Sequence, residues 1–355
     1  MIVHERPILG VSVGDPGGIG PEITLKALNV KDIYEICRPL AVADMGVMRD
    51  ALSFSGVDIK LNKINHPSEG LYQHGTIDVL DMDNLEPGEL KYKQVTAAQG
   101  RASFEYVRKV IEMALAEEID GTVTGPISKE AINAAGFHYA GHTEIYADLT
   151  STRDYAMMLV DGDFRVVHVS THVSLKEACE RVKKDRVLRV INLADSALKQ
   201  FGIKSPRIAV AGLNPHCGEA GIFGHEDEEE IRPAVEHAIQ KGIDANGPLP
   251  ADTVFSKMKG GMYDVVVVMY HDQGHIPMKL IGFRLDQETG AWKTLAGVNI
   301  TLGLPIVRAS VDHGTAFGKA GEGRANEQSM VEAIRLGTLM ANTRIRRAGA
   351  GAQDK

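Results

Sequence analysis

The sequence predicts an α/β protein in which mostly parallel sheets are flanked by helices. Strand-like apolar runs alternate with segments of helical periodicity along almost the whole chain of 355 residues, and this alternation is typical of parallel sheets covered by helices. Neither an internal repeat nor a low-complexity linker interrupts it. A chain of this length usually forms two domains or one large two-lobed domain. We therefore expect a two-lobed α/β fold.

The elements expected in the first part of the chain begin with a buried strand over residues 8–13. The glycine-rich turn GDPGGIG follows, and Pro21 stands where the next helix begins, a position at which proline is common. The later elements are strands over residues 39–43 and 77–80, a helix over residues 97–118, a strand over residues 121–124 and a helix that begins at GPISK.

Three apolar runs in the second part of the chain each end shortly before a histidine. They are RVVHVSTH at His172, RIAVAGLNPH at His216 and DVVVVMYH at His271, and we expect a strand in each. The remaining elements are helices over residues 185–201 and 226–241, a strand over residues 306–311 and a closing helix over residues 326–343.

Composition and charge exclude several classes of protein. The net charge of −8 argues against nucleic acid as the main partner, because a phosphate backbone requires a basic face. Cys37, Cys179 and Cys217 form no CxxC pair, which is typical of free thiols in a reducing cytosol. The most apolar run, residues 265–270, is far shorter than the roughly 20 residues of a membrane helix. The amino terminus also lacks a signal-peptide core, so we expect a cytoplasmic protein without a membrane segment.

The three histidines that follow strands are the strongest indication of function. In open α/β sheets, ligand sites form beyond the carboxyl ends of the strands. Imidazoles delivered there by His172, His216 and His271 could converge on one point, and neutral imidazole is a common ligand of divalent metals. The alternative for each histidine is a hydrogen bond that merely caps its strand. The three together favour a shared metal site.

Several other polar residues are candidates for binding an anion. In GHTE, residues 141–144, Thr143 could cap a helix whose first N–H groups would attract an anion. Arg308 lies inside the apolar strand PIVRASV, where an unpaired cation is costly, and arginine suits bidentate binding of phosphate or carboxylate. Lys279 and Asn299 lie in the region after the His271 strand. Solvated surface positions are the alternative for each of them.

Two acids and two glycine-rich loops complete the candidates. Asp272 adjoins His271, and Asp252 lies in the turn GPLPADT, so either carboxylate could orient a ligand or move a proton beside a metal, with a turn or cap role as the alternative for Asp252. The turn GDPGGIGPE, with Asp15, is not the GxGxxG dinucleotide fingerprint, and it is either a close-approach site or a tight turn. The loop VDHGTAFGKAG could lie flat against a planar ligand or be a simple connector.

These motifs together resemble one family. The segments GDPGGIGPE, GHTE, STH, GLNPHCGE, NGPLPADT, MYHDQG, GVNITLGLP and SVDHGTAF occur in the order found in the 4-hydroxythreonine-4-phosphate dehydrogenase family, from about residue 8 to about residue 342. The resemblance implies a fold like that of isocitrate and isopropylmalate dehydrogenases. It also implies oxidation of a secondary alcohol with NAD, or alternatively NADP, followed by loss of carbon dioxide from the β-keto acid.

The resemblance assigns roles to individual residues. Zn²⁺ is the favoured metal, with Mg²⁺, Mn²⁺ and Co²⁺ as alternatives. The implied sets are metal ligands His172, His216 and His271; substrate-binding residues His142, Thr143, Lys279, Asn299 and Arg308; catalytic residues Asp252, Asp272 and Lys279; and cofactor-binding residues His313, Gly314, Thr315 and Ala316.

The resemblance also implies how the chain is organised. Residues 1–139 and 311–355 would form one lobe, residues 140–310 the lobe with the metal histidines, and the active site would lie between the lobes and at a homodimer interface. Three departures from the family pattern stand out. Cys217 and Gly17 each replace a common alanine, and an insertion of roughly ten residues at 284–296 lies between Lys279 and Asn299 where a tight turn is usual.

The substrate remains open between two branches of the family. The segments DYAMMLVDGDFRVVHVSTH and YHDQGHIPMKLIGF are most similar to a branch that acts on 4-phospho-D-threonate and 4-phospho-D-erythronate. The alternative is the 4-hydroxythreonine-4-phosphate dehydrogenase of pyridoxal phosphate biosynthesis. Outside this family, a metal-dependent phosphoester hydrolase would use the same histidines without the loop DHGTA, and a two-lobed solute-binding protein would need no metal chemistry.

Overall fold

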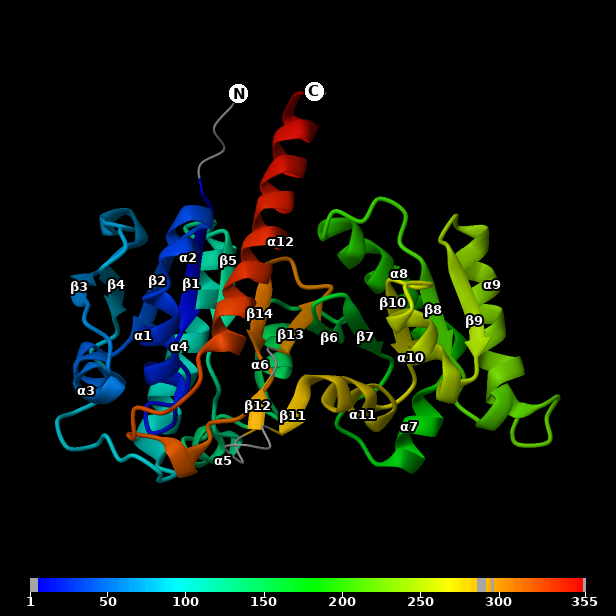
Figure 1. The fold of residues 1–355 in the computed structure, drawn as a ribbon, viewed down its shortest axis with the longest axis horizontal. Coiled ribbons are helices and arrows are strands. Elements are labelled where there is room, and N and C mark those ends of the chain that lie inside the picture. Colours follow the sequence, from blue (N-terminus) through cyan, green and yellow to red (C-terminus); the bar gives the residue numbers. More distant parts are fainter. Residues whose placement is uncertain (1–5, 286–291, 295–296, 354–355) are drawn as a thin grey trace. The chain divides into compact units, whose positions relative to one another are not determined.

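The computed structural model describes residues 6–285, 292–294 and 297–353. The chain forms two compact units: the first holds the chain up to Thr152 and from Leu304 onward, and the second is Arg153–Gly303 (Figure 1). The boundaries expected from the resemblance are 139/140 and 310/311. The observed boundaries put His142, Thr143 and Arg308 in the first unit, whereas the three candidate metal histidines lie in the second.

The first unit contains a parallel sheet with the strand order β3-β4-β2-β1-β5-β14. Its middle strands are buried because they consist of apolar and small residues on both faces, which is typical of parallel sheets. The strands are β1 (Ile8–Ser12), β2 (Arg38–Ala43), β3 (Lys60–Ile64), β4 (Thr76–Asp81), β5 (Gly121–Thr124) and β14 (Arg308–Val311).

Helices cover this sheet, and the longest two, α4 and α12, both pack against β5 and β1 (Figure 1). Helix α4 follows a Thr96 cap and buries Phe104, Val107 and Ile111 along one side. The helices of the first unit are α1 (Gly20–Leu28), α2 (Lys31–Ile36), α3 (Met45–Ser55), α4 (Ala97–Leu115), α5 (Lys129–Ala134), α6 (His142–Leu149) and α12 (Gln328–Gln353), with short turns η1 (Pro67–Glu69) and η4 (Phe317–Lys319).

The second unit has the strand order β13-β6-β7-β10-β8-β9. The four strands from β7 to β9 are parallel, whereas β6 runs antiparallel to both β7 and β13. The strands are β6 (Ala156–Asp161), β7 (Phe164–His168), β8 (Ile208–Ala211), β9 (Ala245–Leu249), β10 (Val265–Val268) and β13 (Val298–Leu302).

Helices α10 and α11 cover one face of this second sheet. Val254 and Met258 of α10 and Met278 of α11 share a core with Val166 and Val266 of the strands. The helices are α7 (Leu175–Arg181), α8 (Lys184–Gln200), α9 (Arg232–Gln240), α10 (Ala251–Lys259) and α11 (His271–Gly282), with the short elements η2 (Pro215–Gly218) and η3 (Asp227–Ile231).

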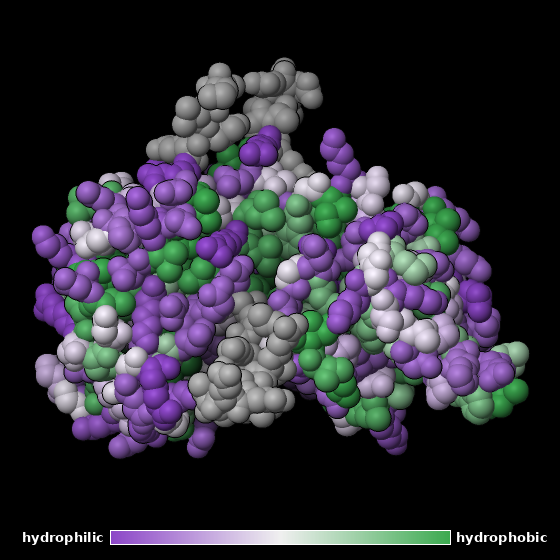
Figure 2. All heavy atoms as spheres, viewed as in Figure 1, coloured by the Kyte–Doolittle hydropathy of each residue, from purple (hydrophilic) through white to green (hydrophobic). Residues whose placement is uncertain are grey.

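The α/β class with mostly parallel sheets and flanking helices is therefore confirmed. The expected insertion at 284–296 lies partly outside the described residues; its described ends form an antiparallel pair, β11 (Phe283–Leu285) with β12 (Trp292–Thr294). Hydrophilic residues predominate on the face shown in Figure 2, with smaller hydrophobic areas between them. Within the described part of the chain, no helix has the length and apolar character needed to cross a membrane.

Candidate active site

The three candidate metal histidines follow three neighbouring parallel strands of the second unit. His172 comes after β7, His271 after β10 and His216 after β8, and β10 lies between the other two. Because parallel strands end at the same edge of a sheet, the three loops emerge together at the edge where ligand sites form in α/β folds.

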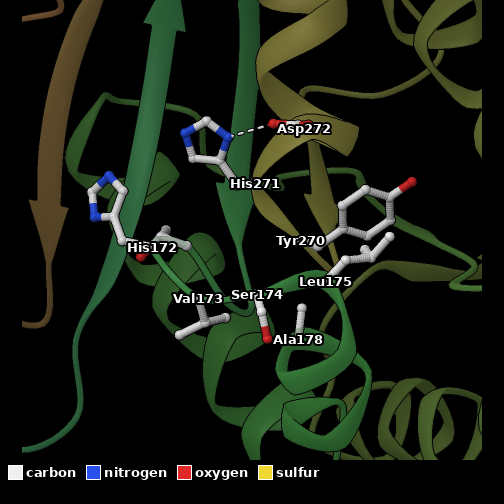
Figure 3. A pocket seen from close by; sticks show the side chains of 9 residues that line it. His172, Val173, Ser174, Leu175, Ala178, Tyr270, His271 and Asp272 are labelled. Carbon is white, nitrogen blue, oxygen red and sulfur yellow. Dashed lines mark hydrogen bonds and ion pairs between the residues drawn. The ribbon is translucent and has the colours of Figure 1, made fainter.

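His172 and His271 line one pocket of about 520 Å³. Their ring centroids are 5.7 Å apart, and the two rings lie side by side in Figure 3. His172 follows β7 in the loop that leads to α7, whereas His271 is the first residue of α11. The structure thus brings two of the three expected imidazoles together.

The ring of His271 is oriented by a carboxylate. Its Nδ1 lies 2.7 Å from Oδ1 of Asp272, and this bond is drawn in Figure 3. When Nδ1 donates its proton to the carboxylate, the lone pair of the imidazole is on Nε2, the tautomer that metal-binding histidines with a carboxylate partner use. Asp272 therefore orients the ring of His271, one of the two roles expected of it.

Two further histidines lie close to His271, and the sequence analysis did not single them out. His275, one turn along α11, stacks on His271 with ring centroids 3.6 Å apart and an angle of 10° between the planes. His168, the last residue of β7, lies 4.9 Å from His275. Burial and the nearby His275 lower the pKa of His168 to about 3, so this imidazole is neutral. The spacing of His271 and His275 on one helix face was the available signal.

His216 lies in an unusual backbone segment. Residues 216–221 all have positive φ, including 52° at His216 and 57° at Cys217. Left-handed backbone is unfavourable for residues with a Cβ atom, so this segment stores strain. The nearest ring to His216 is Phe223, at 6.4 Å between centroids. Within the described ranges, no three His, Cys, Asp or Glu side chains are gathered closely enough to hold a metal ion.

Acidic residues surround the His216 segment. Asp227 is buried and accepts hydrogen bonds from the backbone N–H groups of Leu213 and Asn214. Burial, followed by the charges of Asp227 and, more weakly, Asp252, raises the pKa of the Cys217 thiol to about 11, so Cys217 is a protonated thiol at neutral pH. Asp252 itself is exposed in the first turn of α10.

The donor set suits a divalent metal. Neutral imidazole is a preferred ligand of Zn²⁺ and related ions, and a carboxylate on the second ring nitrogen is the usual support of such a ligand. His172 and His271 share one pocket, the Nδ1 of His271 has the carboxylate of Asp272 as its partner, and His216 follows the neighbouring strand at the same edge. These residues therefore fit the metal that the resemblance implies.

Arg308 is buried in β14 of the first unit, with 2% of its surface exposed. Its guanidinium lies 5.5 Å from the centre of the Tyr146 ring, and the Tyr146 hydroxyl donates to Oγ1 of Thr122. Burial lowers the pKa of Arg308 to about 10, while Tyr146 and the Glu144 carboxylate on α6 act in the opposite direction. A cation kept charged in this environment favours an anionic ligand.

His142 lies close to Arg308. It is the first residue of α6, and burial together with the positive charges of Arg308 and Lys129 holds its pKa well below the usual range. Its buried Nε2 has no hydrogen-bond partner among the described residues. The expectation that Thr143 caps this helix is wrong, because Gly141 takes the cap position and Thr143 lies in the first turn. A buried neutral imidazole beside a guanidinium can donate to an oxyanion.

The loop His313–Ala316 is held by the glycine-rich turn that follows β1. The N–H of Ile19 donates to the carbonyl of Thr315 at 3.0 Å. A Cβ atom at Gly18 would lie 3.0 Å from Cβ and O of Thr315, so only glycine fits without displacing the loop. Space around Gly314 is open, as a loop that receives a ligand requires. The sequence motifs did not reveal this contact.

Gly17 and Asp15 of the same glycine-rich turn are also tightly packed. At Gly17 a Cβ atom would lie 2.7 Å from the backbone oxygen of Lys91 and would also clash with the Gln99 side chain, so an alanine here would require the backbone to shift. Asp15 is completely buried, and burial raises its pKa to about 6.

The other two expected substrate ligands belong to the second unit. Lys279 lies in the last turn of α11 and is half-buried. Asn299 lies in β13 opposite Leu159 of β6.

Comparisons with known proteins agree with the family resemblance. The family model described as pyridoxal phosphate biosynthetic protein PdxA matches residues 35–337. A protein of Symbiobacterium thermophilum, provisionally named D-threonate 4-phosphate dehydrogenase, is 46% identical over 96% of this chain and 98% of its own.

Two solved structures are similar over almost the whole chain. The 4-hydroxythreonine-4-phosphate dehydrogenase of Klebsiella pneumoniae is 40% identical with a TM-score of 0.84, and it covers 95% of this chain and 98% of its own. That of Burkholderia phymatum is 41% identical with a TM-score of 0.80, covering 95% and 99%. The chain therefore belongs to the family of the pyridoxal phosphate biosynthetic protein PdxA, which includes the 4-hydroxythreonine-4-phosphate dehydrogenases.

Proposed function

We propose that the protein is a metal- and NAD-dependent dehydrogenase that oxidises the C3 hydroxyl of 4-phospho-D-threonate or 4-phospho-D-erythronate, with subsequent loss of carbon dioxide. The observation that carries the proposal is the pair His172 and His271 in one pocket, with Asp272 on the second ring nitrogen of His271. The 46% identity to a protein provisionally named D-threonate 4-phosphate dehydrogenase supports the substrate class.

His172, His271 and His216 would hold the metal through neutral imidazole nitrogens. A divalent ion bound there would act as a Lewis acid, which lowers the pKa of the alcohol that is oxidised. Asp272 would keep His271 in the metal-binding tautomer. Asp252, close enough to influence Cys217 in the His216 segment, would accept or return a proton during the reaction.

Arg308, His142 and Thr143 would bind the phosphate of the substrate. The buried guanidinium of Arg308 can donate two parallel hydrogen bonds, and the free Nε2 of His142 can donate a third. Lys279 and Asn299 would contact the remaining polar groups of the substrate. These contacts would fix the C3 hydrogen for transfer.

The loop His313–Ala316 would receive the adenosine part of the nicotinamide cofactor. Open space at Gly314 leaves its backbone accessible, and the hydrogen bond from the N–H of Ile19 to the carbonyl of Thr315 holds the loop in place. The homodimer that the resemblance implies remains part of this proposal.

The test is NADH formation by the purified protein loaded with Zn²⁺, Mn²⁺ or Co²⁺. We expect turnover with 4-phospho-D-threonate or 4-phospho-D-erythronate and much less with 4-hydroxythreonine 4-phosphate. The reverse preference would support the second candidate, which the names of the similar solved structures favour. Release of inorganic phosphate without NADH would indicate a hydrolase and contradict the proposal.

A further inference from the structure

Buried hydrogen bonds tie the three histidine loops of the second unit together. The Ser170 hydroxyl, two residues before His172, donates to the carbonyl of Met269 at 3.0 Å. The N–H of Met269 donates to Oε1 of Gln273 at 2.7 Å, and Nε2 of Gln273 donates to the carbonyl of Gly212 at 2.7 Å. Both side chains are buried. The chain of bonds therefore crosses from the end of β7 to the end of β10 and on to the end of β8.

Gln273 occupies the central position in this chain. Met269 leads directly into His271, and Gly212 begins the segment that leads to His216. One side chain thus joins the backbones before two candidate ligands that come from different strands. A primary amide suits this position, because its oxygen accepts from the N–H of Met269 while its nitrogen donates to the carbonyl of Gly212.

The backbone that follows Gly212 is also held in place by its neighbours. Asp227 holds the next two backbone N–H groups, and a Cβ atom at Gly212 would lie 2.7 Å from Oδ1 of Asp227 and 2.9 Å from Sγ of Cys217. The carbonyl of Gly212 consequently has little freedom to find another partner. A displacement at Gly212 would be passed along the chain to His216.

We propose that Gln273 is a positioning residue, which fixes the start of the His216 segment relative to the strand end that carries His271, so that the candidate ligands are held in place before a metal binds. Gln273 does not itself contact the metal or the substrate. It acts by keeping the ends of β8 and β10 in register, because a ligand set from separate loops binds tightly only when those loops are fixed before the metal arrives. This inference rests on the proposed metal site.

Two variants separate the contributions of the amide. Gln273→Met keeps a similar length and removes both hydrogen bonds. Gln273→Glu keeps the acceptor for Met269 but places a carboxylate oxygen against the carbonyl of Gly212. We expect both variants to bind metal about 10- to 100-fold more weakly, the range seen when residues that support metal ligands are replaced.

The chain offers a matched control in the first unit. Gln99 is also a buried amide that accepts from a backbone N–H, that of Lys91, and donates to a backbone carbonyl, that of Gln94. Gln99→Met should lower the melting temperature about as much as Gln273→Met, because each removes the same two kinds of bond. It should leave metal affinity unchanged.

The experiment is a titration of the metal-free full-length protein with Co²⁺, without substrate or NAD, followed by the visible absorption of the bound ion. Weaker binding in both Gln273 variants, with wild-type affinity in Gln99→Met, is the expected result. Wild-type affinity in either folded Gln273 variant would overturn the inference, and Gln273→Glu decides the matter if Gln273→Met does not fold. Failure of the wild-type protein to bind Co²⁺ would instead contradict the proposed metal site.

Discussion

Replacing His168 by leucine is expected to weaken the dependence of folding stability on pH. The pKa of His168 falls from the ordinary 6.5 to about 3, first because of burial and then because of the charge of His275. Between these two values the unfolded chain binds a proton that the folded protein does not. The penalty is absent above pH 6.5 and grows as the pH falls towards 3, so this residue lowers the stability in acid.

The magnitude follows from the two pKa values. At pH 5, proton binding stabilises an unfolded histidine by about 2 kcal/mol, while the folded imidazole gains almost nothing. At pH 7 the difference is close to zero. The wild-type protein should therefore lose about 2 kcal/mol more than His168→Leu when the pH is lowered from 7 to 5.

The assay is urea unfolding at pH 5, 6 and 7, followed by circular dichroism. Asp15 acts in the opposite direction: burial raises its pKa to about 6, so its stabilising contribution is complete below pH 3.8 and is lost as the pH rises through 6. The two effects overlap, which is why the variant is compared with the wild type at each pH. His138→Leu, at an exposed position, is the control. Parallel curves for wild type and His168→Leu would refute the reasoning.

Three further predictions concern ligand binding. Arg308→Ala should raise KM for the phosphorylated substrate about thirty-fold or more without a similar change for NAD, since loss of a buried charged contact costs about 2–5 kcal/mol. Arg308→Lys should recover only part of this affinity. An unchanged KM with a lower Tm would indicate a structural arginine. Gly18→Ala should raise KM for NAD several-fold, because the added methyl group displaces Thr315. The measurement is steady-state kinetics with NAD varied at saturating substrate. Unaltered NAD kinetics would exclude the loop His313–Ala316 from the cofactor site. Asp272→Asn should weaken Co²⁺ binding about 10- to 100-fold, because the amide supports the His271 tautomer less well; Co²⁺ affinity equal to wild type would mean that the carboxylate has no such role.

The fold was predictable to the extent that strands and helices have different periodicities. The strand over 121–124 and the helix over 97–115 were expected close to where they occur. Periodicity does not encode strand direction, so the antiparallel pairing of β6 and β13 was not expected. The two-residue turn Gly162–Asp163, with positive φ at Gly162, is the local signal for the antiparallel hairpin of β6 and β7.

The candidate site was predictable where chemistry follows a strand end. His172 and His271 were expected together, and they line one pocket. The contact between His168 and His275 depends on how β7 meets α11, which no local pattern reveals. The support of the loop 313–316 by Gly18 likewise joins residues far apart in the chain, so it required the tertiary structure.

The left-handed segment at 216–221 limits which amino acids can follow His216. The backbone of this segment adopts the left-handed conformation that D-amino acids prefer. Cys217, Glu219 and Ala220 adopt it although each carries a Cβ atom. Branched side chains such as valine or isoleucine would be the most unfavourable replacements at these three positions, and glycine the most compatible. The amino acids at these three positions are therefore restricted by the conformation of the backbone alone.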